Sequence, residues 1–377
     1  MTFAALGLDL RLLSALEAAG YSEPTPVQAE AIPALLANRD ICGTAQTGTG
    51  KTAAFALPIL HRIATTPPRD GIRALILAPT RELAEQIGAS FAQYGRNLPY
   101  IRCSVVIGGM KPRAQKRALD GGVDILVATP GRLLDLCGRG AVQLHTVECF
   151  VLDEADRMLD MGFIKDVRSI AARMPPKRQT ILFSATMPPP VERFTTSILR
   201  NPVRISVDQK NSVAEGVSQL VYYVGQPEKG EKLKQILADR SITSAIVFVR
   251  TKKGADRIAG GLIGRGIRVA VIHSDREQSE RSAALAEFKS GRARIMVATE
   301  IAARGLDIDG VSHVINHDIP TVAESYVHRV GRTARAGAIG TAISLCAPEE
   351  VPLLREIERL TGVPLQNGDA PEFPPSS

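Results

Sequence analysis

Short apolar runs alternate with segments of helical period along nearly the whole chain, and this alternation constrains the fold more than any other feature of the sequence. The runs are rich in Val, Ile and Leu and have the length of buried strands. The segments between them have the period of helices that cover a sheet. This alternation predicts the α/β class, with mostly parallel sheets flanked by helices.

The alternation is interrupted once, which predicts two domains. At 377 residues the chain exceeds what one core usually serves, although length alone also allows one large α/β domain. In the first half we expect strands within IRALILAP, IRCSVVIG, VDILVAT, CFVLDEA and TILFSAT, residues 72–79, 101–108, 123–129, 149–155 and 180–186. The polar segment after NPVRISV predicts a flexible linker, and six further apolar runs follow it, beginning with VSQLVYYV and SAIVFVR. The predicted division is a first domain at 1–207, a linker at 208–216, a second domain at 217–365 and a disordered tail at 366–377.

The composition is that of a soluble globular protein, with 45% hydrophobic and 23% charged residues. There is no apolar run of about 18 residues, and the N-terminus lacks the pattern of a secretory signal, so we expect neither membrane insertion nor export. The cysteines have neither C-x-x-C spacing nor metal-ligand spacing near His, which favours reduced thiols in a cytoplasmic protein; they are Cys42, Cys103, Cys137, Cys149 and Cys346.

The formal net charge of +7 and the pI near 9.3 are compatible with a polyanionic partner. Residues 1–207 hold 24 basic and 18 acidic side chains, whereas residues 208–377 hold 22 and 21. The positive excess is therefore concentrated in the first half.

The segment AQTGTGKT, residues 45–52, is nearly the phosphate-binding pattern G-x-x-x-x-G-K-[ST], with Ala45 in place of the first Gly. DICGTA before it predicts a strand, and KTAAFALPILHRIA after it predicts a helix. In that context Gly48 and Gly50 would let main-chain N–H groups surround phosphate oxygens at the helix N-terminus. Lys51 would reach the β- and γ-phosphates, and the Thr52 hydroxyl would ligate Mg²⁺. By itself the segment could also be an exposed Thr/Gly turn.

Acidic residues follow another apolar strand in VLDEAD, residues 151–156. Ligands of open α/β sheets bind at the carboxyl ends of the strands, where these acids would lie. Asp153 could hold Mg²⁺, and Glu154 could orient or deprotonate an attacking water. Acids at a strand end more often cap helices, so the catalytic interpretation depends on the phosphate loop. Together the two motifs predict an NTP hydrolase.

The chain resembles the DEAD-box ATP-dependent RNA helicases. Residues 153–156 spell Asp-Glu-Ala-Asp, and AQTGTGKT, with its Ala, is the form that this family uses. The resemblance extends from Phe3 to about residue 346, and DEADRMLDMGF is more similar to the bacterial RhlE-like group. It implies two tandem RecA-like domains joined by a flexible linker, with ATP and Mg²⁺ as cofactors.

GYSEPTPVQ, residues 20–28, resembles the adenine-reading motif of the family. Gln28 would hydrogen-bond the adenine edge, Tyr21 would stack on its face, and Phe3 matches the upstream aromatic. The resemblance places the remaining loop positions at the nucleotide as well, namely Gln46, Thr47 and Thr49.

SAT, residues 184–186, resembles the motif that couples hydrolysis to strand separation. There the hydroxyls of Ser184 and Thr186 would bond the DEAD acids, Asp156 among them. Helix capping ahead of Met187-Pro188-Pro189 is an equally ordinary role for such residues.

ESYVHRVGRTARAG, residues 324–337, resembles the arginine-finger motif, in which Arg332 and Arg335 would stabilise charge on the γ-phosphate. His328 would link ATP to the RNA side. TEIAARGLDI, residues 299–308, places Gly305 beside the nucleotide and Asp307 at the ribose hydroxyls. Because these residues and the phosphate loop fall in different halves, the resemblance implies that hydrolysis requires the domains to close.

The sequence departs from the family pattern at three positions. Glu300 replaces the usual Asp after Thr299, Ser274 turns HGD into HSD, and Ala334 replaces the Gly between the fingers. If the main chain at 334 needs a positive φ, Ala strains it by about 1 kcal/mol, whereas a helical conformation tolerates Ala. We expect activity to survive.

Several motifs at predicted strand ends resemble the RNA-backbone contacts of the family. They read phosphates and 2′-hydroxyls, so binding should be independent of base sequence and should weaken with salt. The absence of Trp and the 4% aromatic content argue against base stacking as the main source of affinity. The matched positions are Thr80, Arg81, Gly108, Gly109, Thr129, Pro130, Gly131 and Arg132 in the first half, and Arg250, Thr251, Gln278, Arg281 and Thr299 in the second.

The resemblance implies an RNA-dependent ATPase that separates short RNA duplexes locally or remodels ribonucleoprotein. An ATP-gated RNA clamp or assembly platform would use the same site with little unwinding. A DNA-tracking translocase of the wider superfamily fits less well, given GYSEPTPVQ and DEAD. Proteins of ribosome assembly or RNA decay are compatible partners, and the sequence names no particular RNA.

Overall fold

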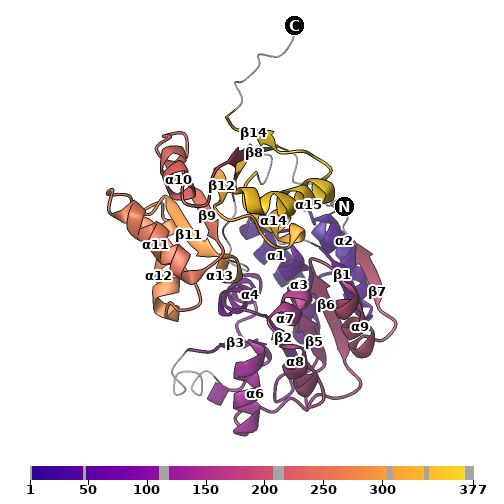
Figure 1. Cartoon of the computed structure of the whole chain (residues 1–377). Helices are drawn as coiled ribbons and strands as arrows, with labels where there is room; N and C mark the ends of the chain where they lie inside the picture. The colour runs from indigo at the N-terminus through magenta and orange to yellow at the C-terminus, as the bar shows by residue number, and fades with distance from the viewer. Residues whose placement is uncertain are drawn as a thin grey trace. The chain divides into compact units, whose positions relative to one another are not determined.

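The computed structural model describes residues 2–45, 48–109, 119–206, 216–303, 308, 310–334 and 339–369. The chain divides into two compact units, Met1–Gln209 and Lys210–Ser377. Each unit is an α/β domain built on one parallel seven-stranded sheet (Figure 1). The expected fold class is confirmed.

The first sheet has the strand order β3-β4-β2-β5-β6-β1-β7, with parallel pairing throughout. All five expected runs form strands, as does DICGTA. The strands are β1 (Ile41–Thr44), β2 (Ala74–Leu77), β3 (Cys103–Val106), β4 (Ile125–Ala128), β5 (Cys149–Leu152), β6 (Gln179–Ser184) and β7 (Val203–Ser206).

Helices cover both faces of this sheet because the central strands are apolar on both sides. One core joins the sheet to the earlier helices through Leu12, Ile32, Phe55 and Phe91, and these helices are α1 (Leu10–Ala18), α2 (Pro26–Leu36), α3 (Lys51–Thr65) and α4 (Arg81–Tyr94). The 3₁₀ helix η1 (Phe3–Leu6) joins the same core. The opposite core contains α6 (Pro130–Gly138), α7 (Ala155–Asp160), α8 (Ile164–Ala171) and α9 (Pro189–Ile198).

The second sheet has the order β10-β11-β9-β12-β13-β8-β14, again parallel. The six expected runs form β8 (Val217–Tyr223), β9 (Ala245–Val249), β10 (Val269–Ile272), β11 (Ile295–Thr299), β12 (His313–Asn316) and β13 (Gly340–Cys346). One face carries α10 (Lys229–Leu237) and α11 (Lys252–Ile263). The other carries α12 (Gln278–Lys289), α13 (Glu300–Ala303), α14 (Ala323–Val330) and α15 (Val351–Thr361).

One expectation is corrected at the C-terminal end of the described chain. The sequence predicts a disordered tail from residue 366, but Gln366–Asn367 form β14, which pairs with Leu220 and Val221 of β8. Gly368 lies against the ring of Tyr222, where an added Cβ would be 2.3 Å from a ring carbon, and Asp369 pairs with Lys232 at 2.8 Å. Main-chain pairing, a small residue and an ion pair hold this segment, so its sequence carries no apolar signal. Residues 370–377 of that tail and 208–215 of the expected linker lie outside the described residues.

Candidate functional site

The phosphate loop connects β1 to the first turn of α3. Gly48 and Gly50 have φ values of 84° and 89°, which only Gly adopts without strain, and Gly50 caps the helix. Lys51 is 6% exposed, and its Nζ donates to the carbonyl of Ala45 at 2.9 Å. Gln46 and Thr47 lie outside the described residues. The described part of the loop thus presents a buried ammonium at a helix N-terminus, the features that favour an anion.

Ala45 belongs to the packed core of the first unit. Its N–H donates to the carbonyl of Ser184 at 3.0 Å, which extends the pairing of β1 with β6 by one residue, and the residue is only 2% exposed. The methyl group therefore fills apolar space, which explains why this position accepts Ala in place of Gly.

Gln28 contacts the phosphate loop directly. Its Oε1 accepts the N–H of Thr25 at 3.0 Å, and its Nε2 donates to the carbonyl of Gly50 at 3.1 Å. The Thr25 hydroxyl donates to the carbonyl of Thr49 at 2.8 Å. The side chain of Gln28 is buried at 1% exposure, so this amide joins α2 to the loop. The amide oxygen can accept a second hydrogen bond, and the NH₂ group can donate a second one. The contact of Gln28 with adenine stays a prediction.

Tyr21 lies in an aromatic cluster with Phe3 and Tyr94. The ring of Tyr21 makes edge contacts with both, at centroid distances of 6.4 and 5.8 Å, and its hydroxyl is 3.0 Å from that of Tyr94. Phe3 is buried. Burial, with the Tyr21 hydrogen bond, raises the pKa of Tyr94. Tyr94 could not be predicted from the sequence, because a Tyr at the end of an amphipathic helix has no distinguishing pattern.

Asp153 is the first residue after β5 and is 2% exposed. Burial raises the pKa of its carboxyl group to about 6, a shift that Lys51 opposes and Glu154 increases. Oδ1 accepts the N–H of Glu154 at 3.0 Å. A buried carboxylate that lacks full charge compensation is well suited to a cation, and a hard oxygen ligand suits Mg²⁺.

Glu154 turns the chain sharply from β5 into α7. Its φ of 56° is in the left-handed region, which a non-Gly residue enters only at some energetic cost, and such strain is common at active sites. Its Oε2 receives Nη1 of Arg157 at 2.7 Å, and both side chains are buried. The turn and the ion pair fix the direction of the Glu154 carboxylate. The sequence pattern alone does not identify this role of Arg157.

The SAT segment holds Asp156 through both of the residues that were predicted to bond the DEAD acids. Thr186 donates its N–H and its hydroxyl to Oδ2 of Asp156, at 2.8 and 2.9 Å. Ser184 differs from the expectation, because its Oγ accepts the main-chain N–H of Asp156 at 3.1 Å and donates to the Thr186 carbonyl. Ser184 therefore contacts the main chain of the DEAD segment, whereas the contact with the carboxylate comes from Thr186.

The three first-half motifs expected at RNA lie at the carboxyl ends of β2, β3 and β4, which are neighbours in the sheet. Thr80 caps α4, its Oγ accepting the N–H of Leu83 at 3.4 Å. The Arg81 guanidinium lies beside Gly108 and Gly109. A Cβ added to Gly109, whose φ is 82°, would be 2.4 Å from Nη1 of Arg81.

The TPGR segment begins α6 at the end of β4. Thr129 is its N-cap residue, Pro130 its first residue, and a Cβ at Gly131 would meet no atom within 4 Å. Arg132 pairs with Asp135, Nη1 to Oδ2, at 2.6 Å. Arg81 and Arg132 thus lie on segments that leave neighbouring strands at one sheet edge.

Second-half positions expected at RNA follow β9 and β11, which are also neighbours. Thr251 caps α11, and Arg250 donates Nη2 to Glu350 at 2.8 Å. Thr299 ends β11, and α12 begins at Gln278 and includes Arg281.

The segment expected to carry the fingers is α14 and the turn after it. Arg332 is 6% exposed, His328 is half-buried, and Arg335 lies outside the described residues, as do Gly305 and Asp307. Ala334 has a φ of 52°, so the main chain there does take the left-handed conformation that favours Gly.

Glu300, the second departure, binds Arg329 at the end of α14. Its Oε2 accepts Nη2 of Arg329 at 2.6 Å, and its Oε1 accepts the Ser325 hydroxyl. Arg329 also donates Nη1 to Asn316 Oδ1 and to the Asp318 carbonyl. Burial lowers the pKa of Arg329 to about 9, a shift that Asp318 opposes. Ser274, the third departure, is an exposed turn residue.

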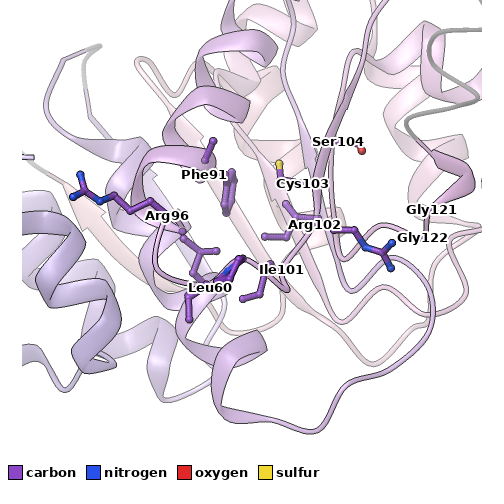
Figure 2. Close-up of a pocket in the computed structure, with 14 residues that line it drawn as sticks. Leu60, Phe91, Arg96, Ile101, Arg102, Cys103, Ser104, Gly121 and Gly122 are labelled. Carbon is purple, nitrogen blue, oxygen red and sulfur yellow. The ribbon is translucent and has the colours of Figure 1, made fainter.

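Two cavities lie away from these segments. One cavity of about 470 Å³ lies at the amino ends of β3 and β4, with Phe91 and Ile101 among its lining residues and Arg96 and Arg102 extending to either side (Figure 2). A similar cavity of about 460 Å³ lies at the amino end of β10, beside Arg268. Because β3 and β10 occupy the same position in their sheets, the two cavities lie at corresponding places in the two units.

Among the described residues, no helix combines the length and apolarity needed to cross a bilayer. The same residues contain no group of three or more His, Cys, Asp or Glu side chains arranged for a metal.

Sequence models of two families match the chain. The family described as DEAD/DEAH box helicase matches residues 25–194, and the helicase conserved C-terminal domain matches residues 228–337. The chain is 44% identical over 363 residues to "ATP-dependent RNA helicase CshA" of Limosilactobacillus reuteri, covering 96% of this chain and 72% of the relative. It is 43% identical over 371 residues to "DEAD-box ATP-dependent RNA helicase CshA" of Bacillus licheniformis, covering 98% and 76%. These relatives do not confirm the RhlE-like subgroup.

Solved structures of high similarity are also DEAD-box proteins. S. cerevisiae Dbp5 bound to RNA and ADP BeF3 has a TM-score of 0.88 at 32% identity, covering 97% of this chain and 95% of Dbp5. Mss116p bound to ssRNA and AMP-PNP has a TM-score of 0.88 at 28% identity, covering 99% and 80%. The phosphate loop, the DEAD acids that follow β5 and this agreement over nearly the whole length lead to one assignment: the chain belongs to the DEAD-box ATP-dependent RNA helicases.

Proposed function

We propose that the chain binds RNA by contacting the phosphates and 2′-hydroxyls of the RNA backbone, hydrolyses ATP in response, and separates short RNA duplexes locally. The proposal rests above all on Asp153, a buried carboxylate whose pKa is lowered by the nearby ammonium of Lys51 against the larger effect of burial. A buried ammonium and a buried carboxylate are the two groups that the phosphates of an NTP and its divalent cation would use. RNA comes into the proposal because related structures were solved with RNA bound.

In this proposal Lys51 exchanges the carbonyl of Ala45 for phosphate oxygens when ATP binds. Gln28 and Tyr21 contact the adenine, and Asp307 contacts the ribose. Mg²⁺ would be held by the Thr52 hydroxyl and the Asp153 carboxylate, and when bound it would neutralise charge on the phosphates. The donor set fits, because both ligands are oxygens and one is an anion whose burial raises its pKa.

Glu154 orients the attacking water and accepts its proton, and Arg157 holds the carboxylate in place. Arg332 and Arg335 bring positive charge to the γ-phosphate, where such groups contribute about 10³- to 10⁵-fold in rate. Because they belong to the second unit, we propose that ATP and RNA together close the two domains, 1–207 and 217–365, about the linker 208–216. Hydrolysis then reopens them.

Glu154→Gln tests the hydrolytic role. We expect ATP turnover to be lost while ATP-dependent binding of single-stranded RNA is kept, since the amide preserves the shape but cannot accept the proton. Arg157→Met should lower turnover less, because it removes only the group that orients Glu154. Normal turnover in Glu154→Gln would disprove the assignment of the base.

A strand-displacement assay separates unwinding from clamping. With a short RNA duplex, we expect displacement in the presence of ATP and none in its absence. RNA-stimulated ATPase activity with no displacement would instead support an ATP-gated RNA clamp, and equal stimulation by DNA would support a DNA-tracking enzyme.

A further inference from the structure

The second sheet repeats the strand order of the first, so each strand of one unit has a counterpart in the other. In this correspondence β8 takes the place of β1, β12 that of β5, and β13 that of β6. The helix after β1 begins at Lys51, and the helix after β8 begins at Lys229. Lys229 is therefore the topological counterpart of the phosphate-loop lysine.

Lys229 is fully buried, at 0% exposure, and its surroundings resemble those of Lys51. Its Nζ donates to the carbonyl of His317, the first residue after β12, at 2.8 Å and lies 3.8 Å from the carboxylate of the next residue, Asp318. The connection before it, VGQPE, has no glycine-rich phosphate loop. A buried ammonium requires an anion, and here the protein supplies one in the carboxylate of Glu350, which accepts a hydrogen bond from Nζ.

Glu350 also holds Arg250. It is the last residue of a short 3₁₀ helix (Pro348–Glu350) that follows β13 and is 3% exposed. Oε2 faces Lys229 and the N–H of Ala347, while Oε1 accepts Nη2 of Arg250 at 2.8 Å.

Two further contacts define the position of Arg250. Its Nη2 reaches the carbonyl of Ile319 at 3.2 Å, and its main-chain N–H donates to Oδ2 of Asp318 at 2.7 Å. Its side chain is nevertheless 49% exposed. One side of the guanidinium is thus anchored on a buried carboxylate while much of the side chain stays accessible.

We propose that Glu350, itself held by Lys229, is a positioning residue that orients Arg250 toward an RNA phosphate. The inference rests on the proposed function, which gives Arg250 its contact with RNA, and extends it to two buried residues that would not touch RNA. An arginine whose rotamer is fixed before binding loses less entropy on contact, so the carboxylate strengthens binding without adding a contact.

The test compares Arg250→Ala, Glu350→Gln and the double variant in the full chain, with Glu349→Gln as control because Glu349 is the exposed neighbour. The probe is a single-stranded oligo(U) with AMP-PNP, measured at several salt concentrations. Arg250→Ala should weaken binding about tenfold and lower the slope of log affinity against log salt by about one. We expect a smaller loss in Glu350→Gln, no loss in Glu349→Gln, and a double variant equal to Arg250→Ala alone.

A double variant weaker than Arg250→Ala by the full Glu350→Gln factor would overturn the inference, as would unchanged binding in Glu350→Gln. Unchanged binding in Arg250→Ala would remove Arg250 from the RNA site and the inference with it, while the rest of the proposed function stands. Failure of the parent protein to bind the oligonucleotide would contradict the proposed function itself. If Glu350→Gln does not fold, Lys229→Met/Glu350→Gln removes the uncompensated ammonium as well and takes its place with the same expected results.

Discussion

At the scale of single residues, Asp153 is a group whose charge opposes folding. Its carboxyl pKa is raised to about 6 from 3.8, so the native state keeps a proton that the unfolded state releases, and native stability falls as the pH rises from about 4 through 6. In Mg²⁺-free buffer at pH 7, Asp153→Asn should raise the free energy of unfolding by up to about 3 kcal/mol and abolish ATP turnover. Urea unfolding at several pH values measures this. The gain should shrink toward pH 4, and a gain independent of pH would contradict the electrostatic cause.

Ala334 carries main-chain strain beside one of the proposed fingers. At a φ of 52° an Ala costs about 1 kcal/mol more than a Gly. We expect Ala334→Gly to raise the free energy of unfolding by up to about that amount and to keep ATP turnover. Ala172→Gly is the matched control, because Ala172 has a φ of −67° and should lose stability on the same change. A loss of stability in Ala334→Gly would show that the position is unstrained.

The role of a residue could be predicted only where a local sequence motif identifies it. Lys51 and Asp153 each stand in a local pattern that names their chemistry, and the structure places both in buried positions. Arg157 and Tyr94 have no such pattern, because each acts through one partner that only the fold brings near. For Ser184 the residue was predicted, but the choice between carboxylate and main chain depends on the local turn.

At the scale of elements, β1 is packed so closely that it fixes the base of the phosphate loop. A Cβ on Gly43 would lie 2.3 Å from a ring carbon of Phe183 on the neighbouring strand β6. Gly43→Ala should therefore lower the free energy of unfolding by about 1–3 kcal/mol and weaken binding of a fluorescent ATP analogue. Gly138→Ala, at the last residue of α6 with nothing within 4 Å, should leave binding of the analogue unchanged and should not lower stability, because Ala favours a helix more than Gly does. Parent-like stability in Gly43→Ala would mean that the Phe183 ring can move aside without cost.

The two strands missed from the sequence, β7 and β14, each lie at the edge of a sheet. Val203–Ser206, which forms β7, has only one buried residue, Ile205, and so lacks the apolar run of a central strand. Gln366–Asn367, which forms β14, is exposed on both residues. Central strands are buried on two faces and show it in composition, whereas an edge strand is held mainly by main-chain hydrogen bonds.

At the scale of the whole molecule, the proposed RNA contacts come from strand ends of both units and from a chain with a net charge of +7. We expect affinity for oligo(U) and oligo(A) to agree within a few-fold, and log affinity to fall linearly with log salt. DNA of the same sequence should bind more weakly, since it lacks the 2′-hydroxyl. A preference above tenfold between the two RNAs would show that bases are read.

The repeated strand order has a consequence for the origin of the protein. Two sheets of the same topology, each with a buried lysine opening the corresponding helix, are what duplication of one ancestral unit would leave. After such a duplication the first unit would have kept a lysine, Lys51, whose anion is supplied by the ligand. In the second unit the anion beside Lys229 is a side chain of the protein, Glu350. Substitution of the two lysines should then have different effects. Loss of Lys51 removes an activity from a folded protein, whereas loss of Lys229 removes a part of the fold.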